Sequence, residues 1–490
     1  MDSSDRISTD HSLDEPLSFG TKLAFGAGDL GPAITANVII FFQLIFLTNV
    51  AGIPAGLAGS ILLVGKVWDA VNDPVVGVLT DQTESKRWGR RLPWLFYGAI
   101  PFGLFFVLLW VVPTIGGVSR SFQVGWLFAY YVVMGAISQV FYTVVNLPYT
   151  AMTPELTQDF DERTQLNSYR FAFSIGGSIL SLILAQIIFQ VIPEEQRGLQ
   201  YLTLACICGV IAVLGLYWCV FGTRKRALAF EKRRLEQQDN AENIPLLQQF
   251  KIALSNRPFL FVVGIYLCAW LAVQVTASII PYFVINCMGL QQTQVPPVLI
   301  GVQGTALVML FVWSILSRKI GKKAVFCMGT SLWIIAQFGL FFLQEGQNTL
   351  MYILAVMAGI GVSTAYLVPW SMIPDVIDLD ELQTGQRREG IFYGFMVLLQ
   401  KFGLALGLFF VGMALESAGF IEATAGEALP EQPLSALNAI RWAIGPIPTV
   451  CLVAGIALTL FYPITRPVHD DIKLKLLQRK NAAKNQNSES

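Results

Sequence analysis

About twelve apolar segments, each long enough to form a membrane-spanning helix, recur along this chain of 490 residues. A helix needs roughly 20 apolar residues to cross the hydrocarbon core of a bilayer. Only 13% of the residues are charged, whereas soluble domains carry about 25%. The sequence therefore predicts an all-α polytopic membrane protein. The predicted spans are 22–48, 57–80, 93–113, 123–150, 167–192, 199–222, 257–287, 295–317, 322–343, 348–373, 390–415 and 439–463.

A polar stretch at 223–256, with seven basic residues, separates the predicted spans into two groups of six. Basic segments also follow the second span of each group, at 77–91 and 317–326. This repeat suits a transporter of duplicated architecture, although the rule that places positive charge inside would also produce it. The expected parts are a polar tail at 1–18, a six-helix bundle at 19–222, a central loop at 223–256, a second six-helix bundle at 257–463 and a tail at 464–490.

Lys and Arg gather in alternate loops, and this asymmetry predicts the orientation. The loops 49–56, 288–294 and 344–348 carry neither residue, and 416–438 is acidic. We therefore expect both termini and the central loop in the cytoplasm, with the protein in the plasma (inner) membrane. The basic and apolar tail segment 472–480 would lie on the anionic inner leaflet or form a solvated charged tail.

Composition excludes several classes of function. The net charge is zero, which argues against nucleic-acid binding. The seven cysteines lie in or beside apolar runs and are expected to be small buried hydrophobes, and the two histidines, His11 and His469, lie in the polar tails. No hydrolase, P-loop, zinc-protease or dinucleotide motif is present. We expect neither an enzyme nor a cofactor, apart from a coupling ion.

The predicted span 57–80 carries three charged residues, Lys66, Asp69 and Asp73. A charge at the bilayer centre costs at least about 2.5–3.5 kcal/mol, so three within eight residues must gain something there. The two aspartates share one helix face. They repel each other unless one binds a proton or a cation lies between them. Pro74 cannot donate a helical hydrogen bond and leaves a backbone carbonyl free nearby. The pattern predicts an Na⁺ or H⁺ site; a structural ion-pair cluster with Lys66 is the alternative.

Lys401 lies near the middle of the predicted span 390–415, too far from either end to reach the interface. We expect it to face a central cavity and to approach Asp69 or Asp73 when the cation leaves. It would then act with Lys66 as a coupling element, unless its role is structural. Arg170 is the second choice for this partner.

Further polar residues lie near the ends of predicted spans. Pro148 loosens the helix that carries Tyr142, Thr143, Asn146 and Tyr149, and Arg170 adds a cation in the next span. We expect Tyr142, Asn146, Tyr149 and Arg170 to contact the substrate.

A second polar group lies near the basic loops. Arg90 and Arg91, together with Asp375 and Asp378, are expected to form a cytoplasmic gate or a structural charge network rather than a substrate site.

Six motifs resemble the glycoside–pentoside–hexuronide cation symporters, the melibiose permease-like branch of the major facilitator superfamily. The resemblance runs from about residue 19 to residue 465. The motifs are KLAFGAGDLG (22–31), KVWDAVNDPVVG (66–77), WGRRLPW (88–94), NLPYTAM (146–152), IPDVIDLDE (373–381) and RREGIFYG (387–394).

The resemblance implies the major facilitator fold, with twelve transmembrane helices in two six-helix bundles. It also implies roles for single residues. Asp69 and Asp73 would hold Na⁺, Li⁺ or H⁺, and Asn72 and Thr143 would select the cation. Lys401 would lie near this site. The matching tyrosine and arginine are Tyr142 and Arg170.

The sequence departs from that family where galactosides bind. The family's Lys-Asp pair reads Pro32-Ala33 here, its aspartate reads Asn146 and its stacking tryptophan reads Thr150. The segments LPWLFYGAIP and VPWSMIPDVID also resemble the lysophosphatidylcholine symporter. The substrate is thus a sugar, a glycoside or an amphiphile.

We therefore predict a monomeric cation-coupled secondary symporter that works by alternating access, surrounded by membrane lipid and moving a small solute. A sodium-coupled lysolipid symporter is the first alternative. A non-transporting membrane receptor or structural protein on the same fold is the second, but it would have no reason to keep a costly mid-membrane cation site.

Overall fold

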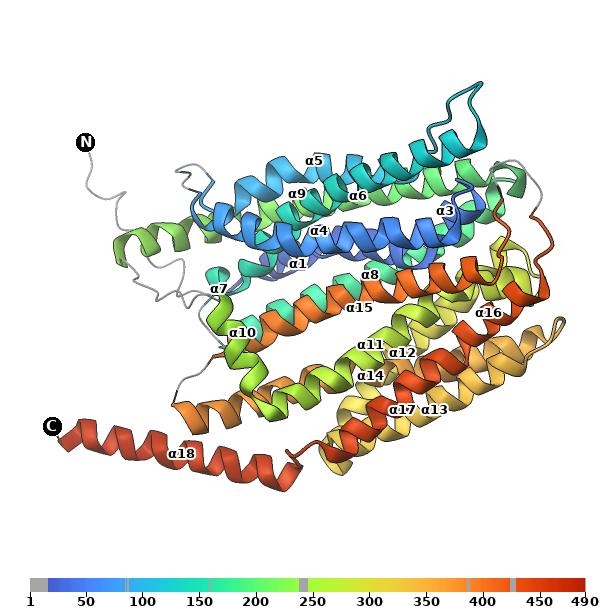
Figure 1. Cartoon of the computed structure of the whole chain (residues 1–490). Helices are drawn as coiled ribbons and strands as arrows, with labels where there is room; N and C mark the ends of the chain where they lie inside the picture. Colours follow the sequence, from blue (N-terminus) through green and yellow to red (C-terminus); the bar gives the residue numbers. More distant parts are fainter. Residues whose placement is uncertain are drawn as a thin grey trace, which may run out of the picture. The chain divides into compact units, whose positions relative to one another are not determined.

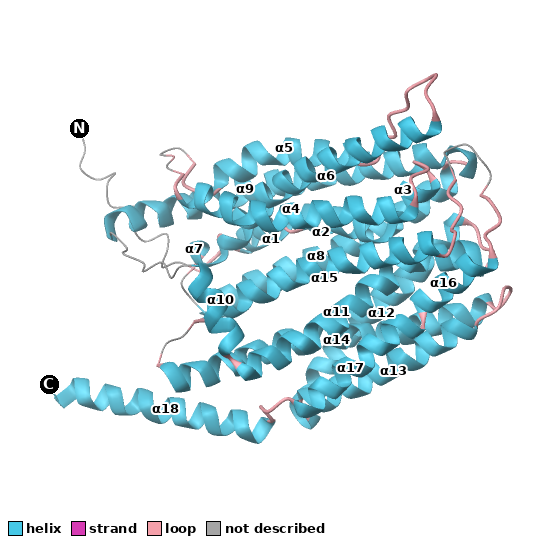
Figure 2. Ribbon diagram, in the orientation of Figure 1, coloured by secondary structure: helices cyan, strands magenta, loops and turns pink. Residues whose placement is uncertain are grey.

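The computed structural model describes residues 16–83, 85, 88–157, 160–237, 246–385, 388–423 and 429–489, and in these ranges the regular structure is helical (Figures 1 and 2). Ten of the described helical segments are long and apolar enough to cross a membrane. Two more complete the twelve predicted crossings: the shorter apolar helix α5 (Leu92–Leu108) and the charged helix α4 (Ala55–Asp81), which is 27 residues long.

The chain divides into two compact units. The first comprises Met1–Ala241, Gln291–Pro297 and Gly412–Pro433, and the second comprises Glu242–Leu290, Val298–Val411 and Leu434–Ser490. The predicted tail at 1–18 lies almost wholly outside the described residues.

Besides α4 and α5, the described residues of the first half of the chain form nine helical elements. They are α1 (Phe19–Ala27), α2 (Leu30–Val38), η3 (Ile39–Gln43), α3 (Leu44–Asn49), α6 (Arg120–Ala151), α7 (Thr153–Leu156), α8 (Phe160–Val191), η4 (Glu194–Gln196) and α9 (Arg197–Gln237).

The second half forms eleven helical elements within the described ranges. They are α10 (Leu246–Ser255), α11 (Arg257–Tyr282), η5 (Phe283–Cys287), η6 (Gln292–Gln294), α12 (Val295–Ile320), α13 (Lys322–Phe342), α14 (Asn348–Thr384), α15 (Glu389–Ser417), α16 (Leu434–Ile444), α17 (Pro446–Phe461) and α18 (Arg466–Glu489).

The first crossing is interrupted rather than one continuous helix as predicted for 22–48. Helix α1 ends at Gly28, and the amides of Gly28 and Asp29 bond back three residues instead of four. Pro32 has no amide hydrogen to continue the ladder in this region. A π-helical turn, η3, follows α2. The break places Asp29 at the junction of α1 and α2.

Other boundaries also differ from the prediction. The last crossing bends at Gly445–Pro446 between α16 and α17, because Pro446 starts a new helix. The predicted central loop at 223–256 is largely helical, since α9 continues to Gln237 and α10 follows. Hydropathy does not mark these helical parts, because the end of α9 is charged and α10 is an amphipathic helix of only 10 residues.

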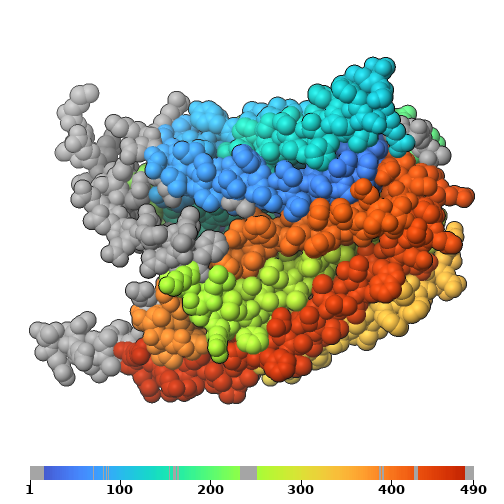
Figure 3. Space-filling model, viewed as in Figure 1, coloured from blue at the N-terminus to red at the C-terminus, as the bar shows by residue number. Residues whose placement is uncertain are grey.

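Small residues let the helices of the first unit approach one another closely. At Gly31 an added Cβ would overlap the backbone of Ala212, so α2 lies directly against α9. Close packing of this kind stabilises helix pairs in membranes. Helix α4 packs along α6, and Figure 3 shows their side chains closely fitted on the face in view. This contact brings together the polar residues described next.

Candidate functional site

Two carboxylates and one hydroxyl meet inside the first unit. Helix α4 carries Asp69 and Asp73 one turn apart, and α6 places Thr143 opposite both. The Thr143 Oγ1 atom lies 3.0 Å from Asp69 Oδ1 and 3.0 Å from Asp73 Oδ1. Asp69 is 0% exposed and Thr143 is 2% exposed. Three oxygen atoms from two helices thus form one buried polar cluster.

The donor set of this cluster suits a hard cation or a proton. The threonine hydroxyl has one hydrogen and can donate to only one carboxylate at a time. Two charged carboxylates in a low-dielectric interior still repel each other strongly. Carboxylate and hydroxyl oxygens are the ligands that hard cations prefer. A monovalent cation or a bound proton would therefore relieve the repulsion that the geometry builds in.

Asn72 and Lys66 flank the cluster on α4. Asn72 is buried, at 8% exposed, and its amide offers an oxygen within the same turn. The Lys66 ammonium lies over the Tyr142 ring, 5.9 Å from its centroid. The Tyr142 ring thereby connects the Lys66 ammonium on α4 with the residues of α6 that are expected to contact the substrate.

Lys401 lies on α15, within the second unit, and is half-buried. Its neighbourhood is tightly packed: Trp270 on α11 donates to the Gln400 carbonyl at 3.0 Å, and Gly403 lies against the Trp270 ring. The expected approach of Lys401 to the aspartates of α4 stays a prediction.

Tyr149 uses its polar group to join two helices. Its hydroxyl donates to the Phe25 carbonyl at 2.9 Å, and the two rings stack at 5.0 Å. Gly28 permits this contact, because a Cβ there would overlap the Tyr149 ring. Asn146, one turn before, is half-buried. Tyr149 is 0% exposed, with its hydroxyl bonded to Phe25 and its ring packed against Phe25 and Gly28. In this structure it holds α6 against α1, and its predicted contact with substrate stays a prediction.

Asp29 is a residue that the sequence reasoning missed. Its carboxylate Oδ2 lies 3.4 Å from Nε of Arg170 on α8, and it also bonds the Ser174 side chain. Asp29 is 7% exposed. The sequence signal was the same as for Asp69, an acidic residue inside an apolar span.

A compact charge cluster lies where α4 and α6 end and α5 begins. Arg90 and Arg91 both contact the Glu155 Oε1 atom on α7 at 2.5 Å. The Glu155 side chain is 9% exposed. Arg226 on α9 donates to the Leu156 carbonyl at 2.9 Å. The two arginines thus hold α7 against the loop before α5.

A matching cluster surrounds the end of α14 in the second unit. The Lys322 ammonium lies 2.6 Å from Asp375 Oδ2, and His469 Nε2 lies 3.1 Å from Asp378 Oδ2 and 3.3 Å from Asp375 Oδ1. The Arg388 guanidinium donates two hydrogen bonds, of 2.6 and 2.9 Å, to the Asp380 carboxylate. His469, Asp380 and Arg388 were not predicted, because the partners lie in separate segments of the sequence.

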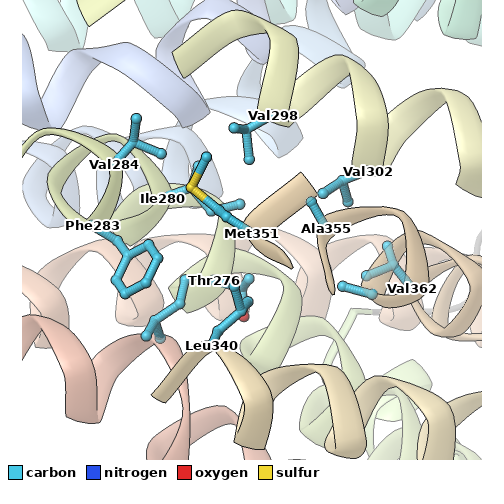
Figure 4. A pocket seen from close by; sticks show the side chains of 12 residues that line it. Thr276, Ile280, Phe283, Val284, Val298, Val302, Leu340, Met351, Ala355 and Val362 are labelled. Carbon is cyan, nitrogen blue, oxygen red and sulfur yellow. The ribbon is translucent and has the colours of Figure 1, made fainter. Parts of the chain in front are cut away.

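The second unit also contains an apolar pocket between α11, α12, α13 and α14 (Figure 4). Among the described residues that line it, Thr276 alone is polar, and the Thr276 hydroxyl is hydrogen-bonded to Gln337. The described lining therefore suits an apolar group better than a polar solute or a cation. The polar clusters of the first unit are therefore the better candidates for a transport site.

Comparison with known proteins gives a family match over most of the chain. Residues 24–466 match the family described as MFS/sugar transport protein. The uncharacterized symporter sll1374 of Synechocystis sp. is 50% identical, over 95% of this chain and 98% of the relative.

More distant relatives are named after different solutes. The sodium-dependent lysophosphatidylcholine symporter 1 of Xenopus tropicalis is 28% identical, over 95% of this chain and 91% of its own. The isoprimeverose transporter of Lactiplantibacillus pentosus is 27% identical, over 96% and 93%. A crystal structure of a mutant of the nucleoside transporter NupG has a TM-score of 0.60 at 10% identity, covering 90% of this chain and 98% of that one. The last likeness shows the fold.

Proposed function

The chain belongs to the MFS/sugar transport protein family, and we propose that a cation bound by Asp69, Asp73 and Thr143 drives its solute transport. The protein is a multi-span secondary symporter with the major facilitator fold, and it is not an enzyme. The coupling ion is Na⁺ or H⁺. The observation that carries the proposal is the placement of three oxygen atoms from α4 and α6 within hydrogen-bonding distance inside a membrane-spanning unit.

Coupling follows from electrostatics. The two carboxylates of α4 lie against the same Thr143 hydroxyl and repel each other when both are charged. Binding of Na⁺ or of a proton removes that repulsion. Because Thr143 belongs to α6, a cation at this site fixes α4 against α6 and stabilises the arrangement in which the neighbouring side chains, Tyr142 among them, can receive the solute.

The solute is a sugar or glycoside, with a lysolipid as the second candidate. The first is favoured by the family and by the isoprimeverose transporter among the relatives. The second is favoured by the sodium-dependent lysophosphatidylcholine symporter. A receptor without transport activity would gain nothing from the buried carboxylates. We place both termini in the cytoplasm, in the plasma (inner) membrane, from the distribution of Lys and Arg.

Uptake by single-site variants tests the proposal. Asp69→Asn and Asp73→Asn each remove one charged ligand while making membrane insertion easier. We expect both variants to reach the membrane in normal amounts and to lose cation-coupled uptake, measured over a panel of glycosides and lysolipids. Wild-type uptake with wild-type cation dependence in both variants would refute the assignment of the cation site.

A further inference from the structure

Helix α18 packs against the end of α14 within the second unit (Figure 1). Four of its side chains, spaced three or four residues apart, make this contact from one helix face: His469, Ile472, Leu476 and Arg479. Ile472 is 4% exposed and belongs to the apolar core of that unit, against which Leu476 also packs. The first turn is attached separately, because Arg466 donates to the Arg318 carbonyl at 2.6 Å. Helix α18 therefore joins the ends of α12 and α14.

The part of α14 that α18 contacts lies beyond a proline. Pro374 is inside α14 and has no amide hydrogen to donate to the carbonyl of Trp370, one turn before it. Helices commonly bend at such positions. The carboxylates at the end of α14 all follow this proline: Asp375, Asp378 and Asp380. The segment 375–384 is therefore attached to the rest of α14 through a weakened turn, and contacts from other elements help to fix its position.

His469 lies among charged groups from several elements. Its Nε2 atom lies 3.1 Å from Asp378 Oδ2 and 3.3 Å from Asp375 Oδ1. The Lys322 ammonium of α13 shares Asp375, at 2.6 Å from its Oδ2 atom. The further charged or titratable groups around this contact are Asp380 with its partner Arg388, Glu381 on α14, Arg466 and Lys473 one turn away on α18, and Tyr462, which is within electrostatic range of Asp375.

The proton state of His469 changes the strength of this contact. A neutral imidazole donates one uncharged hydrogen bond, whereas an imidazolium carries a positive charge and donates from both nitrogens. Hydrogen bonds between a cation and a carboxylate are roughly twice as strong as those between neutral groups. Because two carboxylates lie beside Nε2, protonation of His469 adds attraction towards both. The side chains of His469 and Asp378 keep 15% and 14% of their surface exposed, so protons can reach the contact from water.

We propose that His469 makes α18 a pH-sensitive strap, which holds the segment 375–384 of α14 when His469 is protonated and releases it as the pH rises. The charge of histidine ordinarily changes between about pH 5 and about pH 8. The contact is therefore strongest at the acid end of that range and weakest at the alkaline end. Among the described residues of α18, Ile472 and Leu476 supply its contact with the apolar core, so the polar contacts have a large share in docking.

The inference goes beyond the proposed function, because it involves neither the coupling ion nor the solute. Alternating access requires helix ends to rearrange, and protonation of a histidine at a contact between two elements is an established way to bias such a rearrangement. The strap would make the protein respond to the pH on the side of the membrane where α18 lies.

The position of α18 is measured in the full-length chain in lipid nanodiscs. Spin labels are attached at Leu474→Cys, an exposed position of α18, and at Lys319→Cys, an exposed position of α12, on a background without the seven native cysteines. Double electron–electron resonance gives the distribution of the distance between the labels at about pH 5.5 and about pH 8. We expect the ratio of docked to undocked populations to be about threefold or more higher at the lower pH.

Variants assign this response to His469. His469→Gln cannot gain a charge in this pH range, so it should lower the docked population at the acid pH and remove the pH response. His469→Arg is positively charged at both pH values and should keep α18 docked at both. The chain contains only two histidines, so His11→Gln is the matched control, and it should respond to pH as the labelled background does.

A second measurement follows the end of α14 itself. Ile377 is 1% exposed, so the thiol of Ile377→Cys should react slowly while the segment is held. His469→Gln and His469→Arg are compared on this background at a single pH of about 8, which keeps the thiolate fraction comparable. We expect N-ethylmaleimide to react about threefold faster or more in the glutamine variant.

Equal docked populations at the two pH values in the histidine-containing background would overturn the inference. The same pH response in His469→Gln would overturn it as well, because another group would then be responsible. Equal thiol reaction rates in the glutamine and arginine variants would show that α18 does not hold the end of α14. These readouts use neither solute nor coupling ion, so they stand apart from the uptake measurements that test the proposed function.

Discussion

The proposed function of this protein depends on a few charged residues that are buried inside it. Asp69 is fully buried and shares the Thr143 hydroxyl with Asp73. A buried carboxylate is expensive unless a partner compensates it. The Thr143 hydroxyl has one hydrogen and can donate it to only one of the two carboxylates at a time. We therefore expect Na⁺ or H⁺ to bind at this cluster.

Thr143 provides the first residue-scale prediction. Thr143→Val preserves the shape of the side chain but removes the oxygen, whereas Thr143→Ser keeps it. Since a bond to a charged group contributes about 1.5–3 kcal/mol, we expect the half-saturating cation concentration to rise about tenfold or more in Thr143→Val. Thr143→Ser should stay near the wild type. Cation-activation curves of uptake measure this, and identical curves for the valine and serine variants would contradict a ligand role.

The second prediction about a single residue concerns Lys401. We predict that its ammonium approaches Asp69 or Asp73 in the cation-free state, because the second carboxylate needs a positive partner beyond Lys66. Lys401→Ala should impair cation-coupled uptake, and a lysine-specific crosslink to α4 should disappear when the cation is added. An experimental structure with the ammonium far from both aspartates would exclude this role.

The sequence identifies some of the candidate functional residues but not their partners, and it misses others. Charges within apolar spans point to Asp69 and Asp73 directly, because such charges are costly in a bilayer. The same signal marks Asp29, but its pairing with Arg170 depends on how α1, α2 and α8 pack. His469 has no signal at all, since a polar tail residue acquires its carboxylate partners only when α18 packs against α14.

Helix α14 is held at one end by contacts between its carboxylates and basic residues from three other segments. Asp375 meets Lys322, Asp378 meets His469 and Asp380 meets Arg388. Arg479 of α18 also donates to the Leu382 carbonyl at 2.6 Å. Helix α14 ends just beyond, at Gly385, whose φ of 72° favours glycine. This end of α14 is therefore held by charge as well as by packing.

The element-scale prediction concerns Lys322. Lys322→Ala leaves Asp375, whose side chain is 6% exposed, without its ammonium. We expect the free energy of unfolding to fall by about 1–3 kcal/mol, seen as a lower melting temperature in detergent. Adding Asp375→Asn should recover part of the loss, which a double-mutant cycle measures. Lys319→Ala, at an exposed position of α12, is the control. Equal melting temperatures for the two lysine variants would contradict the account.

The sequence predicts the membrane-crossing helices that consist of one long apolar run. The crossings formed by α6, α8, α11, α13 and α15 follow the predicted spans, because burial in lipid selects for apolar helices of fixed length. The break between α1 and α2 and the bend before α17 arise from glycine and proline positions, which hydropathy does not weigh. Helix α10 is short and amphipathic and α18 is rich in charged residues, so neither contains an apolar run of membrane-spanning length.

At the scale of the whole molecule, orientation is the property that the charge distribution predicts. We expect Arg233 to lie in the cytoplasm and Glu431 outside, because basic loops stay inside. Cysteine at each position, on a background without the seven native cysteines, should react with an impermeant thiol reagent in intact cells only at Glu431→Cys. Labelling of Arg233→Cys alone would reverse the topology.

The proposed cation between α4 and α6 drives the solute across the membrane. Substrate-induced charge movement in proteoliposomes on a solid support tests this coupling for Na⁺ and H⁺ alike. We expect substrate addition to move positive charge inward in the wild type, with an amplitude set by the Na⁺ concentration or the pH, and we expect Asp69→Asn and Asp73→Asn to abolish the current. An unchanged current in both variants, or solute uptake without charge movement or cation dependence in the wild type, would contradict it.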